Sequence, residues 1–120
     1  MTNKTNSELK GKLVRDKIPE IILSSGKKPI YTVCEDDDEY FTRLTIKLEE
    51  EVKEFKEATT YKHKLEECAD IFEVLKHIIS FLDIDSQSWC DFLFIYTLKE
   101  KERGAFTNRI VLKGVEENGK

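Results

Sequence analysis

Glu50-Glu51-Val52-Lys53-Glu54 and, further along the chain, Glu67-Cys68-Ala69-Asp70 each place two carboxylates three residues apart. Neither stretch has Gly or Pro in it or near it, and apolar residues around both recur at steps of three and four. That periodicity is typical of amphipathic helices. It predicts two helices, over residues 38–58 and 64–82, with one pair of acidic side chains on each.

The position of the carboxylates on these helices indicates a metal site. At about 100° per residue, Glu51 falls inside the apolar arc of the first helix and Glu54 lies at its edge. Glu67 and Asp70 take the same two positions on the second helix. Burying ionised carboxylates without partners is costly, and like charges raise one another's pKa. A divalent cation shared by two antiparallel helices would remove this cost, and oxygen ligands favour Mg²⁺, with Mn²⁺ as the alternative.

Two other interpretations of these side chains remain open. Charged residues make up 37% of the chain, so acidic pairs at this spacing also arise on ordinary solvated helix faces. A di-iron bundle would place His three residues after Glu on paired helices. Glu54 and Asp70 stand there instead, so we expect His63 and His77 to be solvated rather than ligands.

Longer strings around these motifs resemble a known family. The pattern Glu51-x-x-Glu54, twelve residues, Glu67-x-x-Asp70 looks like the metal motif of the MazG-like all-α nucleoside triphosphate pyrophosphohydrolases. Three strings resemble its small single-domain, phosphoribosyl-ATP pyrophosphohydrolase-like branch: Lys12-Leu13-Val14-Arg15-Asp16-Lys17-Ile18-Pro19, Lys47-Leu48-x-Glu50-Glu51-Val52-x-Glu54-Phe55 and Arg103-Gly104-x-Phe106-x-x-Arg109-Ile110. The resemblance extends from about residue 12 to residue 112.

The resemblance implies a fold and a reaction. The fold would be a mainly α, MazG-like helical bundle whose helices pack across a homodimer or tetramer. The reaction would be Mg²⁺-dependent hydrolysis of a nucleoside triphosphate between the α and β phosphates, giving monophosphate and pyrophosphate, as in enzymes that clean the nucleotide pool. Phosphoribosyl-ATP hydrolysis and a non-catalytic helical adaptor that retains the fold are the alternatives.

Each candidate site residue has an expected role. The metal ligands are Glu51, Glu54, Glu67 and Asp70. Glu50 is the best candidate for orienting or deprotonating the attacking water, so the catalytic set is Glu50, Glu51 and Glu54. Four cations are expected to meet the phosphates: Arg15, Lys17, Lys99 and Arg103. A solvated loop for the first two and snorkelling side chains for the last two are the competing interpretations.

The remaining sequence sets the context of this domain. Residues 11–113 are expected to form one domain, between a flexible segment 1–10 and a polar tail 114–120. A short helix from Pro19 to before Gly26 and a last helix over 86–103 complete the bundle. Residues 28–34 and 109–112 are rich in β-branched and aromatic side chains, which predicts a small β element.

Composition excludes several classes of partner. The net charge of −4 does not favour nucleic acid. No apolar run approaches the roughly 20 residues that span a bilayer, and the polar N-terminus has no signal-peptide core, so we expect no membrane association and a cytoplasmic protein. Three widely spaced cysteines form neither a disulfide framework nor a zinc pattern.

Overall fold

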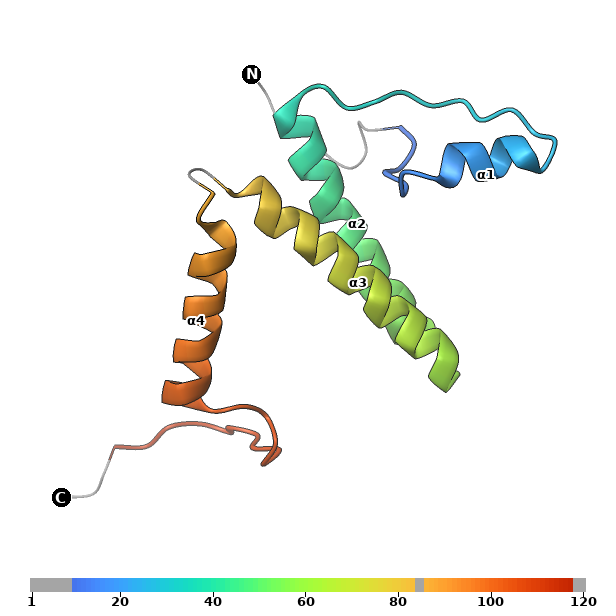
Figure 1. The fold of residues 1–120 in the computed structure, drawn as a ribbon. Coiled ribbons are helices and arrows are strands. Elements are labelled where there is room, and N and C mark those ends of the chain that lie inside the picture. The colour runs from blue at the N-terminus through green and yellow to red at the C-terminus, as the bar shows by residue number, and fades with distance from the viewer. Residues whose placement is uncertain (1–9, 84–85, 118–120) are drawn as a thin grey trace.

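The protein is mainly α-helical, as expected. The computed structural model describes residues 10–83 and 86–117, and Figure 1 shows the arrangement of its helices. The helices are α1 (Ile18–Ser24), α2 (Asp37–Glu57), α3 (Tyr61–Phe81) and α4 (Ser88–Arg103). None of the helices in this described part of the chain is both long and apolar enough to cross a membrane.

Local sequence signals fix where the two long helices begin. The Asp36 carboxylate accepts a hydrogen bond from the backbone N–H of Asp38 at 2.9 Å, which caps α2. The Thr60 hydroxyl accepts one from the backbone N–H of His63 at 3.1 Å, which caps α3. Such caps satisfy backbone donors that have no partner within the helix. Residues 58–60 therefore end one helix and start the next.

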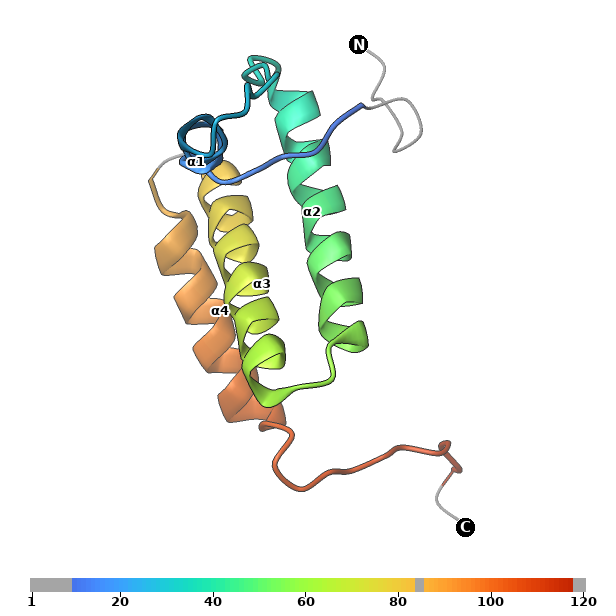
Figure 2. The ribbon, with the colours of Figure 1, turned by 90° about the vertical axis from the view of Figure 1, so that its right-hand side faces the viewer.

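The short connection makes α2 and α3 antiparallel neighbours, which Figure 2 shows side by side. Near the far end of the pair, the ring of Phe81 stacks on Phe41 with centroids 5.1 Å apart and meets the edge of Tyr40 at 5.9 Å. The buried apolar side chains of the described residues are Leu44, Ala58, Val74 and Ile79. This pair of helices is the scaffold on which all four candidate metal ligands lie.

Helix α4 packs on α3, and within the described ranges it makes no contact with α2. Two hydrogen bonds hold the start of α4. The Asp83 carboxylate accepts one from the backbone N–H of Gln87 at 2.9 Å. The indole N–H of Trp89 donates the other to the Ser80 hydroxyl at 3.2 Å. Gly104, with φ of +83°, ends the helix. Beyond its first turns α4 diverges from the α2–α3 pair (Figure 1), which leaves most of its surface open.

The expected β element is not formed. Residues 28–34 and 109–112 are extended, but no strand occurs in residues 10–83 or 86–117. A strand needs a neighbour to pair with its backbone. Figure 1 shows the reason for the difference: one segment leads into α2 and the other follows α4, at opposite sides of the molecule.

The predicted termini fall mostly outside the structural description. Of the expected flexible segment 1–10, only Lys10 is described, and it is exposed. Of the expected tail 114–120, residues 114–117 are described, and they too are exposed.

Candidate metal centre

The antiparallel helices bring three of the four predicted ligands together. Glu51 and Glu54 come from α2 and Glu67 from α3, and one carboxylate oxygen of each lies within 4.8 Å of the others. Oxygen ligands about 2.1 Å from a single octahedral ion lie about 3.0 to 4.2 Å from one another, so small side-chain movements would bring these three oxygens onto one ion. The spacing of the two acidic motifs therefore predicted a real convergence of side chains.

Two of these carboxylates are buried, and one oxygen of each lacks a hydrogen-bond partner. Glu51 is 5% exposed and Glu67 is 6% exposed, and the Oε2 atom of each has no hydrogen-bond partner. Burial raises the pKa of the Glu51 carboxyl, and the neighbouring Glu67 raises this pKa further. The Lys47 ammonium lowers it, whereas the negative charge of Asp70 raises it. Buried carboxylates close to one another are stabilised by a proton or a cation that they share.

Each buried carboxylate also has a basic neighbour four residues before it. Lys47 Nζ lies 3.4 Å from Glu51 Oε1, and His63 Nε2 lies 3.2 Å from Glu67 Oε1. Both contacts use Oε1, and the Oε2 atom of each carboxylate is left without a hydrogen-bond partner. Side chains four apart are neighbours on a helix surface. This spacing was the signal that could have identified Lys47 and His63 as part of the site.

Asp70, the fourth predicted ligand, has a different partner in this structure. Its Oδ1 atom accepts a hydrogen bond from Arg15 Nη2 at 2.7 Å, and the two residues are 55 positions apart in the chain. Both side chains are partly exposed. The Lys12–Pro19 string is thus joined to the second acidic motif through Arg15, a contact that the sequence motifs alone did not indicate.

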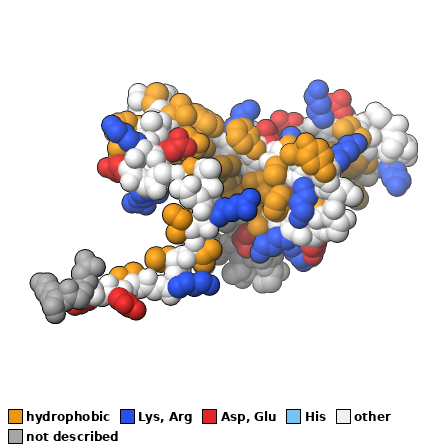
Figure 3. Space-filling model, turned by 90° about the horizontal axis from the view of Figure 1, so that it is seen from below, with side chains coloured by type: hydrophobic (Ala, Val, Ile, Leu, Met, Phe, Trp, Pro, Cys, Tyr) orange, Lys and Arg blue, Asp and Glu red, His pale blue; other side chains and the backbone are white. Residues whose placement is uncertain are grey.

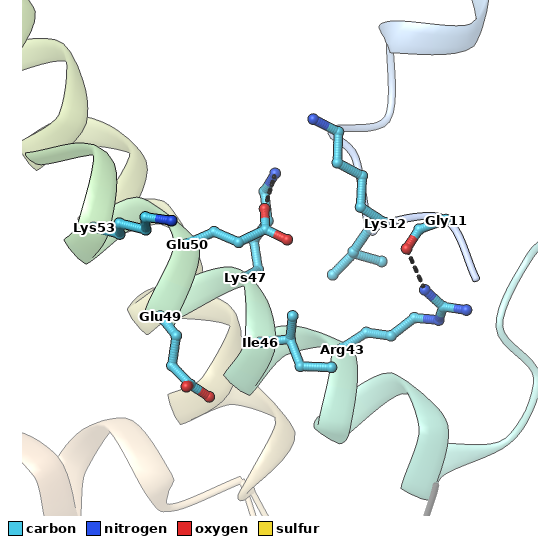
Figure 4. Close-up of a pocket in the computed structure, with 9 residues that line it drawn as sticks. Gly11, Lys12, Arg43, Ile46, Lys47, Glu49, Glu50 and Lys53 are labelled. Atoms are coloured by element: carbon cyan, nitrogen blue, oxygen red, sulfur yellow. Dashed lines mark hydrogen bonds and ion pairs between the residues drawn. The ribbon is translucent and has the colours of Figure 1, made fainter. Parts of the chain in front are cut away.

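The remaining predicted residues lie at different distances from the cluster. Glu50 is half-buried beside it, with Oε2 3.6 Å from Lys47 Nζ (Figure 4). Lys17 is exposed at the start of α1. Lys99 and Arg103 are exposed on the second half of α4, and in the described part of the chain neither forms an ion pair with a carboxylate of the cluster.

The donor set fits a divalent cation. Carboxylate oxygens are hard ligands suited to Mg²⁺ or Mn²⁺, and a bound cation would supply the partner that the two buried Oε2 atoms lack. Glu54 is exposed, so an ion that it binds would be open to water and to a ligand. Among the described residues, this is the group of acidic, His and Cys side chains that could hold a metal.

His63 gives a first testable prediction about this centre. Because His63 fixes the orientation of Glu67, His63→Leu is expected to weaken Mg²⁺ binding about tenfold, the size typical of residues that orient a ligand. Titration calorimetry measures this affinity. His77→Leu is the matched control, since His77 Nε2 pairs with Glu73 Oε2 at 2.8 Å on the same helix, outside the cluster. Equal losses in both variants would show that His63 does not act through Glu67.

Comparison with known proteins leaves the function open. No family model matches the chain, and no solved structure does. An uncharacterized protein of Mycolicibacterium smegmatis (strain ATCC 700084 / mc(2)155) is 48% identical over 54 residues, which cover 45% of this chain and 54% of that protein. The chain thus spans about half the length of this curated relative.

Proposed function

We propose that the protein is a Mg²⁺-dependent, MazG-like nucleoside triphosphate pyrophosphohydrolase that cleaves between the α and β phosphates. The observation that carries the proposal is the pair of buried carboxylates from α2 and α3 whose Oε2 atoms have no partner. The contacts of Lys47 and His63 reach only the Oε1 atoms, so a cation would compensate the two buried Oε2 atoms. The motif order in the sequence supplies the reaction type.

The residues of the cluster have separable roles in this proposal. Glu51, Glu54 and Glu67 hold the cation, and Asp70 joins them when Arg15 exchanges this carboxylate for a phosphate group. When bound, the cation offsets the phosphate charge and acidifies the attacking water. Glu50, which is half-buried beside the cluster, accepts the proton of that water. No covalent nucleophile is required.

We also infer that two or more copies of the chain share a core. The accessible surface of the chain is 11111 Å², whereas a compact monomer of 14.1 kDa exposes roughly 6,700 Å². Large apolar side chains are exposed on α3 and α4, among them Phe72, Leu75, Leu93, Phe94, Ile95 and Tyr96. Figure 3 shows hydrophobic side chains at the surface of one face. Exposed apolar surface of this extent marks a protein interface.

A second copy is the occupant that fits this surface best. Residues 92–96 are apolar on all sides of α4, which is typical of a helix enclosed by others. Packing α4 against another subunit would also let its cations, Lys99 and Arg103, approach the partner's site. That arrangement accounts for two predicted phosphate-binding residues that are far from the cluster within one chain.

A nucleotide panel tests the reaction. The purified full-length protein with Mg²⁺ and a set of normal and damaged nucleoside triphosphates is expected to release pyrophosphate and the monophosphate. Anion-exchange chromatography separates the products. Orthophosphate as the product would reject cleavage between the α and β phosphates. No turnover, together with a melting temperature that is indifferent to Mg²⁺, would favour the non-catalytic adaptor instead.

A further inference from the structure

A second feature is connected to the carboxylate cluster through Lys47, which contacts Glu51 and also lines this feature. It is a cavity of about 440 Å³ between α2 and residues 11–13. Its volume falls within the range of about 300–1,000 Å³ typical of small-molecule sites. Arg43 builds one wall, since its guanidinium donates to the backbone carbonyls of Lys10 at 2.9 Å and Gly11 at 3.4 Å and so fastens this segment to α2.

Positive charge gathers in this cavity. The ammonium groups of Lys47 and Lys53 lie beside Glu50, and the Lys12 side chain extends from the facing segment, whereas Glu49 points away from Glu50 (Figure 4). Lys12 and Lys53 take part in none of the ion pairs found among the described residues. The chain as a whole carries a net charge of −4, so the charge of this cavity is opposite in sign to that of the whole protein.

We propose that this cavity is a polyphosphate subsite, in which Lys12 and Lys53 bind the phosphates of the ligand. Ammonium groups are suited to this role because they act as point charges with three donors each. The inference rests on the proposed function in one respect, that the chain of phosphates continues from the cation site. Lys47 links the two places, since its Nζ lies 3.4 Å from Glu51 and 3.6 Å from Glu50.

The arrangement has a consequence for Glu50. With phosphates in the cavity and a cation at the cluster, Glu50 lies between the two and next to the bond that would be cleaved. Its negative charge opposes a polyphosphate when no cation is present. Glu50→Gln should therefore tighten polyphosphate binding in EDTA, about threefold, as expected for one partly screened charge.

The test measures binding of inorganic tripolyphosphate and of α,β-methylene-ATP in EDTA by titration calorimetry. Without a cation, the result does not depend on hydrolysis or on the metal centre. Lys12→Gln and Lys53→Gln are each expected to weaken tripolyphosphate binding about five- to tenfold, because each removes a hydrogen bond between charged groups. Lys53→Arg should retain most of the affinity. Both positions are exposed, so folding should not suffer.

The matched control is Lys56→Gln, one turn further along α2 and outside this cavity. It should weaken binding less than twofold. Equal loss in Lys56→Gln and Lys53→Gln, or no binding by the wild-type protein, would overturn the subsite. Parallel losses for both probes identify nucleotide phosphates as the ligand, and loss for tripolyphosphate alone identifies inorganic polyphosphate. Normal binding in a protein that never releases pyrophosphate would reject the proposed reaction while retaining the subsite.

Discussion

Glu54→Gln is expected to lower kcat/KM for pyrophosphate release at least about a hundredfold, which corresponds to about 2.7 kcal/mol of transition-state stabilisation. Glu54 is the exposed member of the cluster, and one of its oxygens lies within 4.8 Å of the ligand oxygens of Glu51 and Glu67. The amide that replaces it is neutral and binds a hard cation weakly. Because the side chain is exposed, the metal-free variant should unfold at the same temperature as the wild-type protein.

The control for this prediction is Glu57→Gln, an equivalent change at the last residue of α2. Glu57 is exposed and lies outside the cluster, so its substitution should leave turnover within about twofold, as is usual for isolated surface positions. Asp70→Asn is a second variant for the same measurement. It removes the charge of the predicted fourth ligand, which is also the carboxylate that accepts the hydrogen bond from Arg15. Turnover of Glu54→Gln within tenfold of wild type would show that this carboxylate holds no essential ion.

The sequence predicted the helices and the convergence of carboxylates because both depend on short-range rules. The apolar periodicity defined the bodies of α2 and α3, whereas the cap at Thr60 begins α3 at Tyr61, three residues before the predicted start. A three-residue connection leaves antiparallel packing as the simple solution. Once the helices are antiparallel, the equal positions of Glu51 and Glu67 on their apolar arcs bring these two side chains to the same interface.

The parts that the sequence missed depend on contacts between distant segments. Arg15 reaches Asp70 across 55 positions, and Arg43 fastens residues 10 and 11 to α2; no periodicity encodes either contact. The prediction of a β element was wrong for a related reason. Residues 28–34 have the composition of a strand, but composition alone does not supply a neighbouring strand, and the segment at 109–112 lies elsewhere.

Local spacing also carries information about the basic residues of the site. His63 was expected to be solvated, and its side chain is indeed about half exposed, yet its Nε2 contacts the buried Glu67. Lys47 stands in the same relation to Glu51. A basic residue four positions before a buried carboxylate, present on both helices, is a pattern that depends only on helical spacing and is therefore visible in the sequence itself.

Glu51→Gln is expected to make the metal-free protein more stable and the metal-loaded protein less stable than wild type. In the wild-type protein the Glu51 carboxylate is 5% exposed and faces Glu67, another acceptor. A glutamine amide fills the same volume, carries no charge and donates a hydrogen bond to Glu67 Oε2. Removing a buried charge that Lys47 compensates only in part should raise the free energy of unfolding in EDTA at pH 7 by roughly 1–2 kcal/mol.

The pH dependence follows from the pKa of Glu51, which is raised above its ordinary value of 4.5 in the folded protein. Between pH 4.5 and the raised pKa, the folded chain holds a proton that the unfolded chain has lost, so wild-type stability falls as pH rises through this window. The contribution of Glu51 is fully present below pH 4.5 and is lost above the raised pKa. Glu51→Gln lacks this term, so its advantage in EDTA should be near zero at about pH 4 and should grow as the pH rises through the raised pKa of Glu51.

Mg²⁺ should then make the wild-type protein more stable than Glu51→Gln, the reverse of their order in EDTA. A cation at about one hundred times its dissociation constant adds about 2.7 kcal/mol to the wild-type stability, whereas the variant, which has lost a ligand, gains little. Urea unfolding at pH 4 and pH 7, with EDTA or Mg²⁺, measures all four differences. Glu66→Gln, an exposed change next to Glu67, should show no reversal. A Glu51→Gln protein less stable than wild type in EDTA at pH 7 would mean that the two carboxylates do not repel each other, and the metal centre would then lose its physical basis.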